Sequence, residues 1–140
     1  MAKTIAKVLG VVFILVGILG FLAPGMLGMH LSLAHNLVHL VSGALALYFG
    51  FAGTLSGARL FCIIFGVVYG LLGVAGFLLG GDAAHTVAGV PAHGTDSRLF
   101  AALPGTLELA SPDHLVHILL GIVFLAGGFL TRADVARATD

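Results

Sequence analysis

The sequence predicts an all-α protein, a four-transmembrane-helix bundle made of two tandem helix hairpins. Three observations predict this fold class. Of the 140 residues, 59% are hydrophobic and 9% are charged, whereas a soluble domain carries about 25% charged residues. Four apolar runs reach the length of about 20 residues that a helix needs to cross a bilayer. One histidine-containing pattern occurs twice, each time at the start of such a run.

The four predicted spans cover about residues 5–23, 33–52, 59–80 and 112–131. They leave one long connection, residues 81–111, between the third span and the fourth. The other two connections are short, so consecutive spans run antiparallel. The whole chain is therefore expected to form a single membrane domain.

Local signals mark where the spans begin and end. The Pro-Gly pair at 24–25 ends the first span, because proline disfavours helix in the residue before it and glycine tolerates the turn. The polar segment 54–57 predicts a tight turn between the second and third spans. The Ser-Pro-Asp sequence at 111–113 predicts a helix start, with Ser111 as N-cap and an acid in the first turn.

The connection 81–111 is too long for a simple loop, which indicates a lid or a surface on which a partner docks. Its segment 99–103 is apolar enough to lie on the membrane surface or to cap the bundle. Residues 94–97 predict a turn, and His85 and His93 lie in what we expect to be the flexible part.

The distribution of Lys and Arg predicts the orientation, because short cytoplasmic loops are enriched in these residues. With four spans, all cationic residues but Arg98 fall on one side of the membrane: Lys3, Lys7, Arg59, Arg132 and Arg137. We therefore expect a multi-pass protein of the bacterial inner membrane with both termini in the cytoplasm. All seven histidines then lie at or near the outer face. The net charge of zero gives no argument for a nucleic-acid partner.

The chain contains two similar halves. Segments 10–22 and 66–78 share three glycines and a phenylalanine in register, and segments 35–43 and 113–121 share Leu, Val, His and Gly. This order indicates a tandem duplication of one hairpin, a parallel internal repeat related by a pseudo-two-fold axis along the membrane normal. The glycine rows are typical of helices that pack closely in a bilayer.

The repeated histidine pattern is the only candidate site. Residues three or four apart share a helix face, so His35 and His39 point together, with Asn36 beside them. His114 and His117 form a second pair, with Asp113 one turn before His117. If both faces turn inward, the outer end of the bundle holds a polar, titratable cluster.

Three interpretations of this cluster remain open. The groups can cap helices and bond across them, which is structural. They can also bind a cofactor: His39 and His117 as the axial pair of a b-type haem, or a Zn²⁺ or Cu²⁺ site. The candidate metal ligands are His35, His39, Asp113, His114 and His117. Proton or ion movement is the third interpretation, but the inner halves of the spans hold no charged group that could relay a proton.

The sequence at 35–39, His-Asn-Leu-Val-His, resembles a family of small bacterial four-span membrane proteins catalogued as a domain of unknown function. The resemblance extends to the glycine-rich first span, to Gly-Val-Val-Tyr-Gly at 66–70 and to the acid-plus-histidine start of the fourth span. It implies the four-span topology and no particular substrate or cofactor. The third loop departs from it, being longer and richer in histidine. The architecture is also similar to that of the DoxX-like membrane proteins, an analogy of fold alone.

We expect a non-enzymatic protein, because no nucleophile with a base, phosphate-binding loop or carboxylate pair is found in the sequence. The predicted role is that of a small structural or accessory protein in the bilayer, acting as a homo-oligomer or as a subunit of a larger membrane complex. The alternative is a haem b, Zn or Cu protein that uses the outer histidines for electron transfer or metal handling.

Overall fold

The computed structural model describes residues 1–87 and 90–132, and the side chains of residues 1–85 and 95–132. Four helices are long and apolar enough to cross a membrane, so the chain is a membrane protein with the predicted number of spans. A single 3₁₀ turn, η1 (Met26–Gly28), lies between the first two helices. The four helices are α1 (Ala2–Leu22), α2 (Leu33–Phe51), α3 (Leu55–Leu79) and α4 (Ser111–Leu130).

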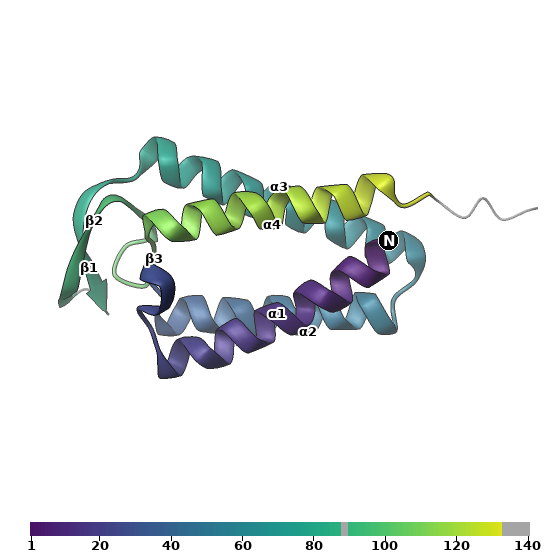
Figure 1. Ribbon diagram of the computed structural model, residues 1–140, viewed down its shortest axis with the longest axis horizontal. Coiled ribbons are helices and arrows are strands. Elements are labelled where there is room, and N and C mark those ends of the chain that lie inside the picture. The colour runs from purple at the N-terminus through teal and green to yellow at the C-terminus, as the bar shows by residue number, and fades with distance from the viewer. Residues whose placement is uncertain (88–89, 133–140) are drawn as a thin grey trace, which may run out of the picture.

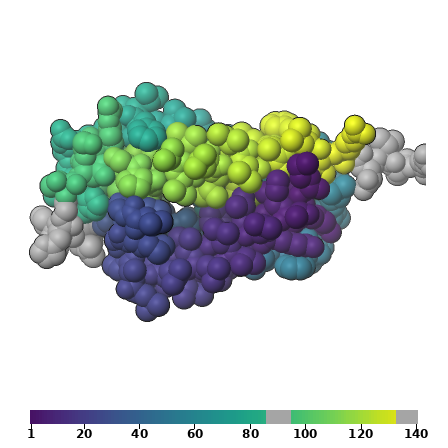
Figure 2. Space-filling view, viewed as in Figure 1, coloured from purple at the N-terminus to yellow at the C-terminus, as the bar shows by residue number. Residues whose placement is uncertain are grey.

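The helices form two antiparallel pairs, α1 with α2 and α3 with α4 (Figure 1). The N-terminus, the α2–α3 connection and the end of α4 lie at one end of the molecule, and the residues between α3 and α4 cover the other end. Figure 2 shows that α4 and α1 lie side by side across one face, with η1 packed against the start of α4. Aromatic side chains fill the interior where the pairs meet: Phe13, Phe61, Tyr69 and Phe124 are at most 4% exposed.

The prediction of an all-α fold was wrong for the long connection, which forms a small antiparallel sheet. Its strands are β1 (Gly81–Val87), β2 (Val90–Leu103) and β3 (Leu107–Leu109), in the order β1-β2-β3. The predicted turn at 94–97 lies within β2. The apolar segment 99–103, predicted to lie on the membrane surface or to cap the bundle, is also part of β2 and pairs with β3. Leu99 and Leu109 are buried, and strand pairing supplies hydrogen-bond partners to backbone groups that burial removes from water.

Two helix starts differ from the prediction. The segment 54–57 belongs to the first turn of α3, because Thr54 caps that helix: its hydroxyl accepts a hydrogen bond from the backbone N–H of Gly57 (3.0 Å). The N-cap of α4 is Ala110 and not Ser111. The carboxylate of Asp113 reaches back to the N–H of Ala110 (2.7 Å), while the Ser111 hydroxyl donates to Asp96 (2.6 Å).

Glycine brings the two helices of each pair into backbone contact. A Cβ atom at Gly73 would meet the His114 carbonyl and the Ile118 N–H of α4, whereas one at Gly70 would meet nothing within 4 Å. The α1–α2 pair shows contacts of the same kind, since a Cβ at Gly17 would meet Leu40 and the Asn36 carbonyl. These glycines therefore set the separation of the helix axes.

We predict opposite effects for two neighbouring substitutions in α3. Gly73→Ala pushes α3 away from α4 and costs about 1–3 kcal/mol of packing free energy, more than alanine gains from helix propensity, up to about 1 kcal/mol. Gly70→Ala, the matched control, keeps only that gain, because its methyl group enters open space. Thermal unfolding in detergent, followed by circular dichroism, should show a lower midpoint for Gly73→Ala only. Equal midpoints for the two variants would contradict this account of the packing.

Candidate functional site

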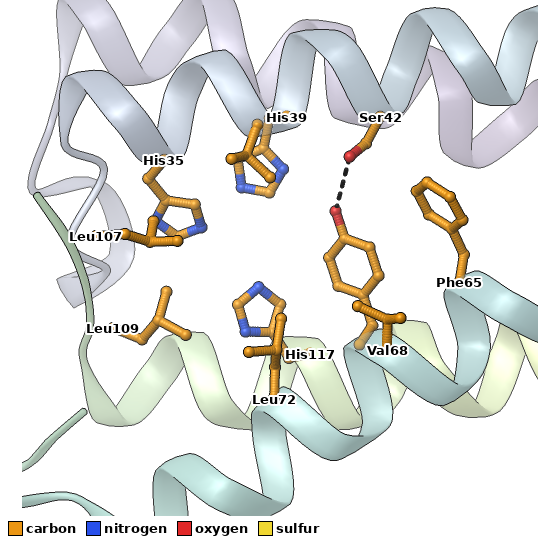
Figure 3. Close-up of a pocket in the computed structure, with 11 residues that line it drawn as sticks. His35, His39, Ser42, Phe65, Val68, Leu72, Leu107, Leu109 and His117 are labelled. Atoms are coloured by element: carbon orange, nitrogen blue, oxygen red, sulfur yellow. Dashed lines mark hydrogen bonds between the residues drawn. The ribbon is translucent and has the colours of Figure 1, made fainter. Parts of the chain in front are cut away.

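A cavity lies between α2, α3 and α4 at the end of the bundle that the sheet covers (Figure 3). Its volume is about 150 Å³, close to that of a protein cavity that accepts benzene. Apolar side chains form most of its wall, and Leu107 and Leu109 of β3 line its end near His35 (Figure 3). The lining residues are His35, Val38, His39, Ser42, Phe65, Val68, Tyr69, Leu72, Leu107, Leu109 and His117.

Three imidazole rings face one another across this cavity, two from α2 and one from α4 (Figure 3). The ring centroids of His35 and His39 are 4.6 Å apart, and those of His35 and His117 are 5.8 Å apart. The three residues are only 2%, 5% and 4% exposed. We call the cavity that these three rings line the imidazole pocket. Sequence reasoning predicted all three, and the structure brings them together.

Each ring of the imidazole pocket has one buried nitrogen without a hydrogen-bond partner: Nε2 of His35, Nδ1 of His39 and Nδ1 of His117. Leaving a buried polar atom unsatisfied costs about 1–3 kcal/mol. Two more such atoms, Oδ1 of Asn36 and Nδ1 of His114, lie on side chains outside the cavity. A molecule in the cavity would supply partners only for the three imidazoles that line it.

Neighbouring groups hold the rings in place. Nδ1 of His35 lies 2.9 Å from the carbonyl oxygen of His30, so Nδ1 carries the proton and Nε2 presents a lone pair. The His39 ring packs on Phe13, with the centroids 5.5 Å apart, and the His117 ring packs on Tyr69 at 5.3 Å. The Tyr69 hydroxyl donates a hydrogen bond to Ser42 (3.3 Å), which connects α3 to α2 below the rings.

The other two predicted site residues lie outside the cavity. Nε2 of His114 is 2.6 Å from the Arg98 carbonyl oxygen, and its ring packs edge-on against Phe77. The carboxylate of Asp113 accepts hydrogen bonds from the N–H groups of Ala110 (2.7 Å) and His30 (3.0 Å). These two side chains attach the sheet and the segment before α2 to the start of α4, and the five predicted ligands do not form one cluster.

The geometry also bears on the predicted cofactors. Among the residues that the structure describes, no group of three or more His, Cys, Asp or Glu side chains is arranged to hold a metal ion. His39 and His117 both reach the cavity, but its volume of about 150 Å³ suits a benzene-sized molecule and not a tetrapyrrole. The residues present therefore do not fit haem.

Sequence reasoning missed the part of the site that β3 supplies. Leu107 and Leu109 face the cavity, and Glu108 between them is buried on the opposite side, beside His30. The Leu-Glu-Leu alternation is the signal that could have revealed this strand, because successive side chains of a strand point to opposite faces. With only three residues, the alternation is too short to be distinctive.

Asp96 fastens the sheet to α4 outside the membrane. Its carboxylate accepts hydrogen bonds from the Ser111 hydroxyl (2.6 Å), the Ser111 N–H (3.1 Å) and the Arg98 N–H (2.7 Å). Partial burial alone would raise the pKa of Asp96, but these hydrogen bonds outweigh it and hold the pKa below its ordinary value.

We therefore predict an acid-sensitive attachment of the sheet. Because the pKa is lower in the folded chain, ionised Asp96 stabilises the attachment above the unfolded value of about pH 4. This contribution is lost as the pH falls through the lowered folded-state pKa. Asp96→Asn should raise amide hydrogen exchange in residues 95–111 at pH near 6, after correction for intrinsic rates. Unchanged protection in the variant would show that the carboxylate does not hold the sheet.

Comparison with known proteins places the chain in a family. No curated protein and no solved structure matches it. A family profile described as a domain of unknown function, DUF4383, matches residues 3–130, which include all four helices and the sheet. The protein thus belongs to the DUF4383 family of unknown function.

Proposed function

We propose that this membrane protein is a non-enzymatic binding protein for a small lipid-soluble molecule, which it takes into the imidazole pocket. The proposed ligand has a head the size of one aromatic ring and an oxygen that hydrogen-bonds to imidazole. The observation that carries the proposal is the set of three buried imidazoles with unpartnered ring nitrogens around a cavity of about 150 Å³.

The polarity of the pocket supports this ligand class. A neutral imidazole offers one N–H donor and one lone pair, so the rings can bond a hydroxyl or a carbonyl oxygen. The remaining wall consists mainly of Val, Leu and Phe side chains, which favour an apolar body. Predominantly apolar walls with a few convergent polar groups are typical of small-molecule sites.

The position of the cavity supports access from the bilayer. Val38 of α2 and Val68 of α3 line the cavity and are also 43% and 48% exposed on the outside of the helices. Leu107 and Leu109 cover the end that faces away from the membrane. A ligand would therefore pass between α2 and α3 from the lipid more readily than through the sheet.

The hydroxyl groups of Ser42 and Tyr69 in the cavity are consistent with a protein that binds its ligand without catalysing a reaction. The Ser42 side chain accepts a hydrogen bond from Tyr69 and lies beside the imidazoles without an activating contact to any of them in the described structure. No described pair of side chains in the cavity therefore has the nucleophile-and-base arrangement of covalent catalysis. A metal ion on the imidazoles is the alternative, and the experiment below separates the two.

The proposal predicts that the pocket distinguishes two ring compounds of similar size. In nanodiscs, para-fluorophenol should bind about threefold to tenfold more tightly than para-fluorotoluene, because one net hydrogen bond is worth about 0.5–1.5 kcal/mol. Fluorine NMR titration measures both. His39→Leu and His117→Leu should remove the preference for the phenol, while His114→Asn, outside the pocket, should keep it. Equal binding of the two compounds would reject the proposal, and stoichiometric Zn or Cu in the purified protein would favour the metal alternative.

A second candidate role, lateral association with another copy of the chain, rests on a groove along α3 and α4. Its volume is about 350 Å³, and Gly66, Gly70 and Gly121 form its floor. The residue of α1 that aligns with Gly70 is Ile14, whose side chain packs on Gly43. The α3–α4 pair lacks this side chain, so its groove has room for a helix from outside.

For this role we expect Gly70→Ile to shift the protein from oligomer to monomer without loss of stability, since a Cβ atom at Gly70 meets nothing within 4 Å and Ile14 packs on Gly43 at the aligned position of α1. Sedimentation in detergent measures the mass. Gly25→Ala, which also enters open space but lies outside the groove, is the control. A wild-type protein that is already monomeric in lipid as well as in detergent would remove this candidate.

The proposal also includes a tandem duplication of one helix hairpin and a cytoplasmic location of both termini. Aligned glycines meet aligned partners in both helix pairs, which supports a duplicated hairpin: Gly10 with Leu47 and Gly66 with Leu125, Gly17 with Leu40 and Gly73 with Ile118, Gly20 with Asn36 and Gly76 with His114. The N-terminus and the α2–α3 connection lie together at the end opposite the sheet (Figure 1). Because short cytoplasmic segments are enriched in Lys and Arg, this arrangement supports a cytoplasmic location of the termini.

A further inference from the structure

We infer that the outer end of the molecule carries a second site, one that binds a divalent transition-metal ion such as Zn²⁺ or Cu²⁺ through His30 and His85. His30 lies in the segment before α2, and His85 lies in β1. The inference is independent of the ligand proposed for the imidazole pocket. Neither histidine lines that pocket, and no histidine of the repeated pattern takes part.

The spacing of the two rings carries the inference. Their Nδ1 atoms are 3.1 Å apart, and the rings meet edge to face with centroids 4.5 Å apart. Two nitrogens that bind one tetrahedral zinc ion at 2.0–2.1 Å lie about 3.3 Å from each other. The two Nδ1 atoms therefore already have the separation of a ligand pair, and an ion would replace the proton that they share.

Glu108 places a negative charge beside the ring of His30. Its Oε2 lies 3.9 Å from Nε2 of His30, on the side of the ring away from His85. At 3.9 Å the carboxylate is too far from Nε2 for a hydrogen bond, but its negative charge favours a proton on Nε2, which leaves Nδ1 as the ligand atom. Glu108 is 4% exposed and His30 is 9% exposed, so the pair is shielded from water and a nearby cation is favoured.

The surroundings add negative charge. The carboxylate of Asp113 accepts a hydrogen bond from the backbone N–H of His30 (3.0 Å), and Asp96 interacts electrostatically with His85. Arg98, the cation of this region, directs its guanidinium to the Phe77 carbonyl (2.8 Å). Imidazole nitrogen suits zinc, copper and nickel, and His85 is only partly buried, so water can complete the coordination.

A bound ion would fasten the sheet to the helices. It would join β1 to the segment before α2, and Glu108 would tie β3 to the same point. Because Leu107 and Leu109 on β3 also cover the imidazole pocket, the ion would hold that cover closed. The site is thus placed to act on the outer end of the pocket without contacting its contents.

The test is titration of the full-length protein, free of any histidine tag, with Zn²⁺ in nanodiscs by isothermal calorimetry. Co²⁺ serves as a spectroscopic probe of the ligands. We expect one ion per chain and a loss of at least about tenfold in affinity for His85→Ala. Glu108→Gln removes a negative charge beside His30 and should weaken binding by a smaller factor than His85→Ala. His39→Leu is the control and should bind the ion as the wild type does.

Three results would overturn the inference: no Zn²⁺ binding by the wild type, full binding by His85→Ala, or loss of binding in His39→Leu with retention in His85→Ala. The last would place the ion in the imidazole pocket. Circular dichroism of each variant shows whether it folds, and His85→Ala is preferred to His30→Ala because His85 is less buried. The fluorophenol titration reports on the pocket alone, so failure of one proposal leaves the other testable.

Discussion

Close helix packing through glycine is the constraint on which the rest of the structure depends. Lipid tails are as apolar as the helices, so helices associate in a bilayer through close contact and not through the hydrophobic effect. Here the glycines of α1 and α3 bring each helix onto the backbone of its partner. Two compact pairs result, and larger side chains must fill the space where the pairs meet. Phe13, Tyr69 and Phe124 do so in the middle of the bundle, with ring centroids 5.2–6.2 Å apart.

The imidazole pocket follows from that division into pairs. At the outer end the aromatic filling stops, and the facing positions of α2 and α4 are occupied by histidine. Rings from different pairs cannot approach as closely as backbones joined through glycine, so a cavity remains between them. The unpartnered nitrogens therefore arise where the two pairs separate, and a ligand there would contact α2, α3 and α4 together. Occupation of the pocket would therefore be coupled to how the two pairs sit against each other.

Hydropathy predicted the spans, because a helix that crosses a bilayer needs about 20 mostly apolar residues. The histidine pattern predicted three of the pocket residues, because residues three or four apart share a helix face. The sheet was missed because β1 and β2 are rich in Ala, Gly, His and Thr, their pairing is irregular, and β3 has three residues. His114 and Asp113 were assigned to the cluster because they share a helix with His117. The spacing of residues along a helix predicts which side chains share a face, but it does not predict which other elements they contact. The Arg98 carbonyl that binds His114 belongs to a strand that the sequence does not reveal.

The segment before α2 connects the two histidine groups. The carbonyl of His30 accepts the hydrogen bond that sets the proton position on His35, while the side chain of His30 contacts His85 and Glu108 and its N–H donates to Asp113. Any change that displaces residue 30, whether the loss of its ring contacts or the binding of an ion, moves the carbonyl as well. His35 could then lose its fixed tautomer, and Nε2 would no longer present a lone pair to the cavity. Through this short stretch of backbone, the tautomer of His35 in the imidazole pocket would respond to changes at the end of the molecule that the sheet covers.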